Sequence, residues 1–225
     1  MKFENTEVFN FEGSLRGMRN PLKSHRKSDS GWRESTLSSL FNPDEYYHIG
    51  ENDLGLAQRL IKAGSEHRKF MRQIFVSVDI TAPLYWWKEA DTYKVGTTAN
   101  STSTMHKLSS TPITQECFEM DDYNDVISKD GEFIFELVTS WSEIIETLEG
   151  LRQAYLKTKD KRLWKELIRL LPESWLQTRT ITMNYENIRN MYFQRKNHKL
   201  TEWSKSFVEW VESLPYAKEL IMYEG

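Results

Sequence analysis

The sequence lacks the features that mark a secreted, disulfide-bonded or membrane-spanning protein. Its single cysteine, Cys117, has no partner in the chain, which excludes an intrachain disulfide and indicates a reducing compartment. No apolar run approaches the roughly 20 residues that a bilayer-spanning helix needs. The segment 1–5 has no apolar core of a secretory signal. We therefore expect a soluble cytoplasmic protein.

The sequence also has little net charge and no pattern typical of a metal site. Thirty basic and 33 acidic residues give a formal net charge of -3, which argues against binding to bulk nucleic acid, because that affinity depends on many cations. The five histidines are scattered, without paired cysteines or a His-x-x-x-His spacing, so no metal is expected. A small anionic ligand stays possible, since a few arginines suffice to bind it.

The hydrophobic pattern predicts both strands and helices. Side chains alternate over 73–80 and again over 177–183, which predicts two strands. Apolar residues spaced by three and four predict long amphipathic helices over 132–158 and 184–212. These elements indicate an α+β fold in which a small antiparallel sheet packs with several long helices.

We expect one domain over 1–225 with two irregular segments. Residues 14–35 are polar and basic and read as a solvated loop, and residues 109–130 read as an irregular loop. A short strand is expected at 8–11. A helix is expected to open at Thr81-Ala82-Pro83, with Thr81 as its cap and the proline in its first turn.

The junction between the last predicted strand and helix carries polar residues that could bind an anion. Asn184 and Arg195 are eleven residues apart, close to three helical turns, so they lie on nearly one face and about 16 Å apart along the axis. The N–H groups of a helix start favour anions, and an arginine can donate two parallel hydrogen bonds. The alternative is that Asn184 only caps the helix and Arg195 pairs with a surface glutamate.

A hydroxyl-rich segment over 97–107 is a second candidate. Hydroxyls and backbone N–H groups together can hold a phosphate. Alternatively, these serines and threonines bond to their own backbone, as is common in loops.

The aromatic pair Trp86-Trp87 beside Lys88 is a third candidate. Such rings could stack on a flat ligand. The alternative, which we favour, is a core helix that packs its tryptophans against the preceding strand.

Taken in order, these segments resemble the flavin-dependent thymidylate synthases. That family has a Leu-Pro, a Tyr-Thr-Arg strand, an Asn that opens a helix, a second Asn six residues later and an Arg five after that. The same spacing occurs here without gaps at Leu171-Pro172, Thr178-Arg179, Asn184, Asn190 and Arg195. In the family the two asparagines contact flavin and the arginine contacts the uracil nucleotide. The resemblance therefore assigns Asn184 and Asn190 to FAD and Arg195 to the substrate.

The upstream half of the chain follows the same family less closely. Ala82-Pro83 matches directly, and Glu89 stands where the family has a glutamine. Asn100 and Ser103 match a family asparagine and serine if one inserted residue is allowed. The resemblance assigns Lys94 and Asn100 to the cofactor, and Ser103 and Glu89 to the substrate.

Several cationic residues of the family motif are replaced here. Thr92-Tyr93-Lys94 stands for Arg-His-Arg, Met105 for an arginine and Ile168 for another arginine. Each lost arginine removes charge-assisted hydrogen bonds worth about 1.5–3 kcal/mol. A lysine cannot reproduce the bidentate fork of an arginine.

The resemblance implies an FAD-dependent methyltransferase of the thymidylate synthase type. Such an enzyme methylates dUMP, or a related pyrimidine nucleotide, with methylenetetrahydrofolate and reduced flavin, and its pocket lies between the subunits of a homotetramer. The pattern also looks similar to proteins of phages and prophages. Two alternatives stay open, because a fold does not fix a function: a non-catalytic nucleotide-binding protein and a structural or interaction protein.

Overall fold

The computed structural model describes residues 1–34, 45–120, 127–129, 132–135 and 137–225, with side chains described outside 121–140. The chain divides into two compact units. Unit 1 comprises residues 1–2, 79–92 and 100–180, and unit 2 comprises residues 3–78, 93–99 and 181–225. The expectation of one domain over 1–225 stays a prediction.

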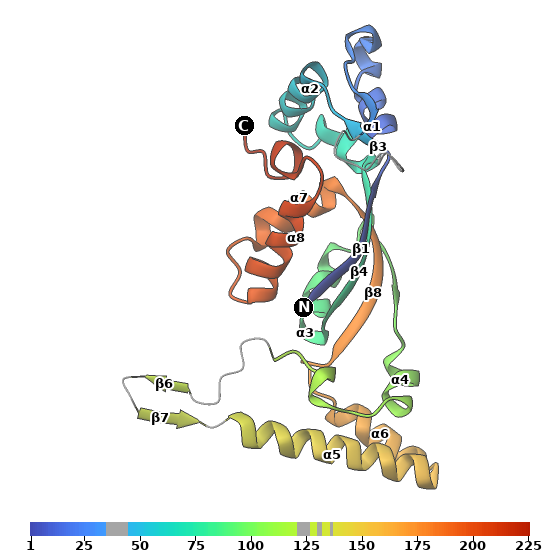
Figure 1. Cartoon of the computed structure of the whole chain (residues 1–225), viewed down its shortest axis with the longest axis vertical. Helices are drawn as coiled ribbons and strands as arrows, with labels where there is room; N and C mark the ends of the chain where they lie inside the picture. The colour runs from blue at the N-terminus through green and yellow to red at the C-terminus, as the bar shows by residue number, and fades with distance from the viewer. Residues whose placement is uncertain (35–44, 121–126, 130–131, 136) are drawn as a thin grey trace. The chain divides into compact units, whose positions relative to one another are not determined.

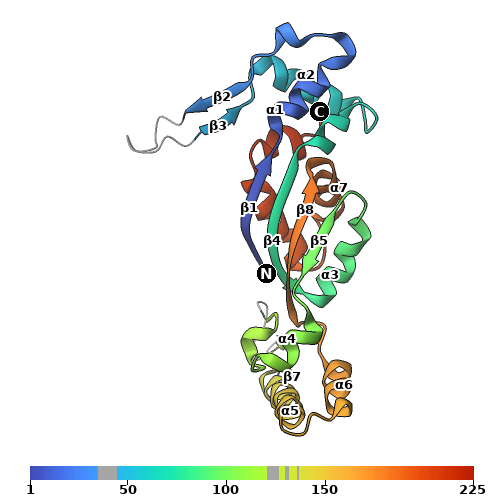
Figure 2. The same cartoon turned by 90° about the vertical axis from the view of Figure 1, so that its right-hand side faces the viewer.

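A four-stranded sheet confirms the expected α+β class. Its strands lie in the order β1-β4-β8-β5 and run antiparallel (Figure 2). Their bounds are Lys2–Phe9 for β1, Phe75–Pro83 for β4, Leu176–Asn184 for β8 and Thr98–Ser101 for β5. Successive strands of this sheet are joined through helices and long connections. Neighbours in the sheet therefore lie far apart in the sequence.

Strand β4 confirms the alternation read from the sequence but extends further than expected. Ile74, Val76, Val78 and Ile80 are at most 1% exposed, and the residues between them are half-buried. The strand continues to Pro83, whose backbone is still extended. Helix α3 (Leu84–Ala90) then begins with Pro83 as its N-cap residue, two residues after the expected cap Thr81. A proline disfavours helical geometry in the residue before it, which explains the shift.

Unit 2 contains most of the short helices. Its further elements are α1 (Phe11–Met18), η1 (Asn20–Leu22), η2 (His25–Lys27), β2 (Gly31–Glu34), β3 (Glu45–His48), α2 (Glu51–Lys62), η3 (Arg68–Gln73), α7 (Tyr185–Arg195), η6 (Glu202–Phe207), α8 (Val208–Ser213) and η7 (Ala217–Ile221). Both α1 and α7 pack against η3, and η7 packs against α2 and α7. Strands β2 and β3 form an antiparallel hairpin, visible in Figure 2.

The loop expected over 14–35 was wrong at both ends, where α1 includes residues 14–18 and β2 includes residues 31–34, while residue 35 lies outside the described residues. Helix α1 covers residues 11–18 and buries Phe11, Ser14, Leu15 and Met18, which have helical spacing. The expected strand at 8–11 is the end of β1, which stops at Phe9 because Asn10 takes a left-handed conformation with φ 72°. The polar residues between the apolar ones concealed this short amphipathic helix.

The helix expected over 184–212 is interrupted. Helix α7 ends at Arg195, and a π-helical segment, η6, follows before α8. The predicted apolar stripe is nevertheless buried, with Trp203 and Phe207 at 0% exposure and Trp210 at 6%. The Trp210 ring stacks on Phe3 of β1 at 4.8 Å between centroids, which joins this helical segment to the sheet edge.

Unit 1 contains α5, the longest helix among the described residues. Besides α3 it has η4 (Asp91–Tyr93, whose last residue belongs to unit 2), α4 (Thr104–Ser110), η5 (Gln115–Cys117), β6 (Ile127–Lys129), β7 (Glu132–Phe135), α5 (Leu137–Thr158) and α6 (Lys161–Leu170). Helix α5 packs against α6 and α4 (Figure 1). The apolar core of unit 1 is formed by Leu108, Ile113, Phe118, Leu148, Leu167 and Trp175. Cys117 is half-buried and packs against this core.

Two expectations for unit 1 need correction. The helix expected from Glu132 begins at Leu137, because residues 132–135 form β7, a strand rich in aromatic and β-branched residues. The loop expected over 109–130 contains the end of α4, η5 and β6, while its residues 121–126 and 130 lie outside the described residues. Among the helices that the structure describes, none combines the length and apolarity needed to span a bilayer.

Candidate functional site

Asn184 begins helix α7 as the first member of a capping box. Its Oδ1 accepts a hydrogen bond from the backbone N–H of Asn187 at 3.0 Å, and Asn187 Oδ1 accepts from the backbone N–H of Asn184 at 3.3 Å. The Asn184 side chain is only 8% exposed. The capping role considered from the sequence is therefore real, and it commits the side-chain oxygen of Asn184.

A short turn over 93–97 lies against the start of α7 within unit 2. Asn187 Nδ2 donates to the carbonyl oxygen of Val95 at 2.8 Å. Gly96 has φ +78°, and a Cβ there would lie 3.4 Å from Asn187 Oδ1 and 3.6 Å from Asn184 Nδ2. The positive φ therefore favours glycine at position 96, whereas a Cβ there would make only ordinary van der Waals contacts with the two asparagines.

Arg195 lies at the other end of α7 between two aromatic rings. Its guanidinium carbon is 5.5 Å from the centroid of Tyr93 and 5.2 Å from that of Trp203. Its Nε donates to the Tyr93 hydroxyl at 2.8 Å, and that hydroxyl donates to Gln194 Oε1 at 3.0 Å. The aromatic contacts hold the half-buried guanidinium in one place.

Lys94 and Asn190 are both exposed. The Lys94 carbonyl accepts hydrogen bonds from the backbone N–H and the hydroxyl of Thr97, which closes the turn that carries the lysine side chain. Asn190 follows Asn184 by six residues and so lies about 120° around the helix axis from it. Unit 2 thus brings Asn184, Lys94 and Arg195 to the 93–97 turn, whereas Asn190 lies on another face of α7.

The remaining predicted residues, Glu89, Asn100 and Ser103, belong to unit 1. Ser103 Oγ accepts from the backbone N–H of His106 at 3.4 Å and caps α4. Asn100 is exposed on β5, and Glu89 is half-buried on α3, where its carbonyl accepts from the Thr92 hydroxyl at 2.7 Å. Two hydroxyls of the 97–107 segment, those of Thr97 and Ser103, therefore bond to local backbone, as the simpler interpretation of that segment predicted.

The aromatic pair Trp86-Trp87 belongs to the core, as favoured from the sequence. Both are 1% exposed, and Trp87 Nε1 donates to the carbonyl of Gln177 at 2.9 Å. Trp87 also packs under the guanidinium of Arg179 at 4.3 Å, and Arg179 Nη1 donates to Asp91 at 3.0 Å. The structural role of Arg179 could not be read from its position in the motif.

Three contributors to the candidate site were missed in the sequence: Tyr93, Gly96 and Asn187. Asn187 had a local signal, because it occupies the third helical position, where a capping box places a polar side chain. Tyr93 contacts Arg195 across 102 positions of sequence, which no local pattern reveals. Among the described residues, no group of three or more His, Cys, Asp or Glu side chains could hold a metal ion.

Comparison with known proteins identifies the fold. No protein-family model and no curated protein matches the chain. The flavin-dependent thymidylate synthase ThyX from Helicobacter pylori complexed with FAD and dUMP is similar, with a TM-score of 0.66 and 14% identity over 100% of this chain and 98% of that chain. Thymidylate synthase X from Helicobacter pylori with FAD and dUMP gives a TM-score of 0.63 and 15% identity over the same shares. The chain therefore has the fold of flavin-dependent thymidylate synthases over its whole length.

Proposed function

We propose that this protein binds FAD and a pyrimidine nucleotide and methylates dUMP, or a related nucleotide, with methylenetetrahydrofolate. The observation that carries the proposal is the placement of Asn184 and Arg195 on one side of α7, with the turn over 93–97 held against that side. The full-length similarity to two structures complexed with FAD and dUMP supports it.

Arg195 is the proposed nucleotide-binding residue. Its guanidinium keeps five N–H donors in a fixed plane, and the flanking rings of Tyr93 and Trp203 set the orientation of that plane. The pyrimidine carbonyl edge would accept from this plane. Ser103 and Glu89 stay proposed substrate residues on the family resemblance alone.

The residues present fit a flavin nucleotide that is held by fewer cations than in the family. Within unit 2, Lys94 is exposed and offers an ammonium to a phosphate, and Asn190 offers an exposed amide. Asn100 stays a proposed cofactor residue on the family resemblance alone. Asn184 has its side-chain oxygen engaged in the capping box, so its amide nitrogen is the group left to donate. When bound, the flavin supplies the hydride, and the protein positions the rings. Because two arginines of the family motif are absent, we expect weaker flavin binding than in the family.

A second subunit is proposed to complete the site. Asn190 lies on a different face of α7 from Arg195, so one α7 can present Arg195 to one ligand and Asn190 to another. A homotetramer, as the family resemblance implies, would place such faces of different subunits around shared ligands.

The test combines spectroscopy with calorimetry. The protein purified with added FAD should retain visible flavin absorbance after dialysis, and titration with dUMP should release or absorb heat. Arg195→Ala should abolish dUMP binding with little change in Tm. Arg162→Ala is the matched control, since that side chain is 90% exposed on α6. A colourless protein, or an Arg195→Ala variant with unchanged dUMP affinity, contradicts the proposal.

A non-catalytic binding protein on the same fold is the second candidate. The replacement of the family Arg-His-Arg by Thr92-Tyr93-Lys94 favours it, since these positions lose cationic donors but keep the turn against α7. Incubation of protein, FAD, a flavin reductant, methylenetetrahydrofolate and dUMP distinguishes the two. Formation of dTMP supports the enzyme, while dUMP binding without product supports the binding protein.

A further inference from the structure

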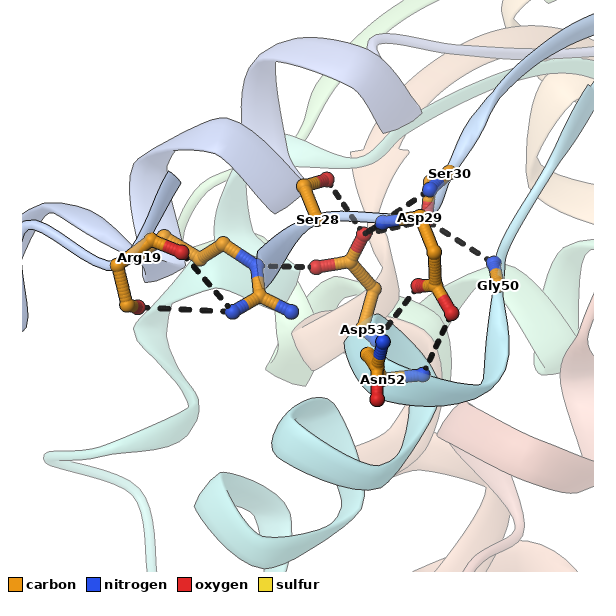
Figure 3. Close-up of polar contacts among 8 residues, drawn as sticks. Arg19, Ser28, Asp29, Ser30, Gly50, Asn52 and Asp53 are labelled. Carbon is orange, nitrogen blue, oxygen red and sulfur yellow. Dashed lines mark hydrogen bonds and ion pairs between the residues drawn. The ribbon is translucent and has the colours of Figure 1, made fainter. Parts of the chain in front are cut away.

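A buried carboxylate fixes the basic segment 19–30 of unit 2 in place (Figure 3). Asp53, in the first turn of α2, is 0% exposed and accepts hydrogen bonds from Arg19 Nε and from the hydroxyls of Ser28 and Ser30, the latter two at 2.6 Å. Asp29 in turn accepts from the backbone N–H groups of residues 52 and 53 at 2.9 and 3.1 Å. The segment that was predicted to be a solvated loop is therefore held in place by hydrogen bonds to buried groups.

Within this network, Arg19 Nη2 has no hydrogen-bond acceptor among the described residues. Arg19 is 4% exposed, and its Nη1 donates to the carbonyl of Ser24 at 3.3 Å. Among the residues that the structure describes, its Nη2 is buried and has no hydrogen-bond partner. A buried guanidinium nitrogen without an acceptor is costly, so the arrangement favours a ligand oxygen at this position.

A basic cavity of about 290 Å³ lies beside this arginine. Arg16, Arg19 and His25 line it together with the hydroxyl-bearing Ser28 and Ser30. Arg16 is 67% exposed along its side chain and lies 4.0 Å from Glu12 Oε1. The charges of Arg19 and Arg16 are thus balanced by Asp53 and Glu12, and hydrogen bonding rather than excess charge would hold an anion here.

A larger aromatic cavity of about 670 Å³ adjoins the basic one. The two share Glu12, Arg16 and Tyr47 as lining residues. The larger cavity is walled by Phe9 and Trp32, which are 44% and 60% exposed. Exposed rings around a cavity of this size are typical of sites that stack a flat ring.

Glu12 lines both cavities and favours a ligand that carries hydrogen-bond donors. Its Oε2 accepts from Trp32 Nε1 at 3.2 Å, and the carboxylate is 59% exposed, so it has capacity to accept further N–H groups. A ring that carries an amino group could therefore stack beside Trp32 and donate to Glu12, while its anionic group reaches Arg16 and Arg19.

We propose that these adjoining cavities of unit 2 form a second nucleotide site, which takes a planar heterocycle with an amino group and an attached phosphate. The site uses none of the residues assigned to FAD or dUMP, and it does not depend on the function proposed for α7. The aromatic walls hold the ring, Glu12 accepts from the amino group, and Arg19 Nη2 donates to a phosphate oxygen.

The test is isothermal titration of the full chain with AMP, adenosine and inorganic phosphate. AMP should bind more tightly than either fragment. Trp32→Ala should weaken AMP binding about 5- to 100-fold, the range expected for loss of one stacking ring. Arg16→Ala should weaken it about 10-fold, the range for loss of one charge-assisted hydrogen bond. Both side chains are exposed, so a thermal melt should show both variants folded.

Arg195→Ala separates this site from the one on α7. AMP affinity should be unchanged in Arg195→Ala, and dUMP affinity should be unchanged in Trp32→Ala. The proposal fails if AMP does not bind, if phosphate alone binds as tightly as AMP, or if Trp32→Ala and Arg16→Ala both bind AMP like the unaltered protein.

Discussion

Replacement of Asp53 by alanine should destabilise the protein more than any exposed charge removal. Asp53 is fully buried and accepts five hydrogen bonds, from Arg19 Nε, from two serine hydroxyls and from two backbone N–H groups. Burial alone would raise its pKa, but the hydrogen bonds from Ser28, Ser30 and Arg19 outweigh burial and lower it. The carboxylate is therefore ionised in the folded state, and its loss leaves the Arg19 charge buried without compensation.

The expected magnitude follows from that uncompensated charge. Removing one partner of a buried ion pair costs about 3–5 kcal/mol in free energy of unfolding. For a chain of this length, each kcal/mol lowers Tm by about 2–4 °C, so Asp53→Ala should lower Tm by roughly 10 °C. The control is Glu166→Ala, which breaks the exposed pair of Glu166 with Arg169 and should cost less than about 1 kcal/mol.

Urea titration and thermal melts of the two single variants and a double variant provide the assay. Arg19→Met combined with Asp53→Ala removes both charges and should be more stable than Asp53→Ala alone, because no buried charge is then left unpaired. If Asp53→Ala costs no more than Glu166→Ala, or if the double variant is the least stable, the reasoning about the buried pair is refuted.

Three further predictions concern other parts of the chain. A hydrogen bond from Arg152 lowers the pKa of Glu149 to about 2 from an ordinary value of 4.5, so the stabilisation is present above pH 4.5 and is lost as pH falls towards 2. Because the Glu149 side chain is 28% exposed, Glu149→Gln should cost about 1–2 kcal/mol in free energy of unfolding at neutral pH. The variant should also show a flatter dependence of Tm on pH in the acid range. Arg189 Nη1 donates to three carbonyls near the C-terminus, so Arg189→Met should speed amide hydrogen exchange over 217–223, and unchanged exchange would contradict the role. Tyr93→Phe removes the acceptor of Arg195 Nε and should weaken dUMP binding by about 0.5–1.5 kcal/mol in calorimetry with Tm nearly unchanged; equal affinity would show that Tyr93 does not position Arg195.

The fold could be predicted where one face of an element is buried and the opposite face is not. The alternation in β4 and the stripe that includes Trp203 and Phe207 follow directly from burial, and both are confirmed. Helix α1 was missed because four buried residues among polar neighbours give only a weak period over two turns. No proline or glycine directly follows Arg195 to predict the end of α7 from the sequence. The break in the helix therefore depends on tertiary packing rather than on a local sequence signal.

The candidate site could be predicted only in its local part. The capping geometry of Asn184 follows from its position at a helix start. The contact of Arg195 with Tyr93 could not be predicted, because it joins segments far apart in the chain.

The lone thiol gives this chain a unique attachment point. Cys117 packs against the apolar core of unit 1, and its Sγ lies 3.7 Å from the carbonyl oxygen of Pro112. A fluorophore coupled there through maleimide chemistry would report on the opening of this core, while hydrogen exchange follows unit 2 separately. Because no other cysteine competes for the label, one denaturation series could show whether the two halves of the molecule melt together or in succession.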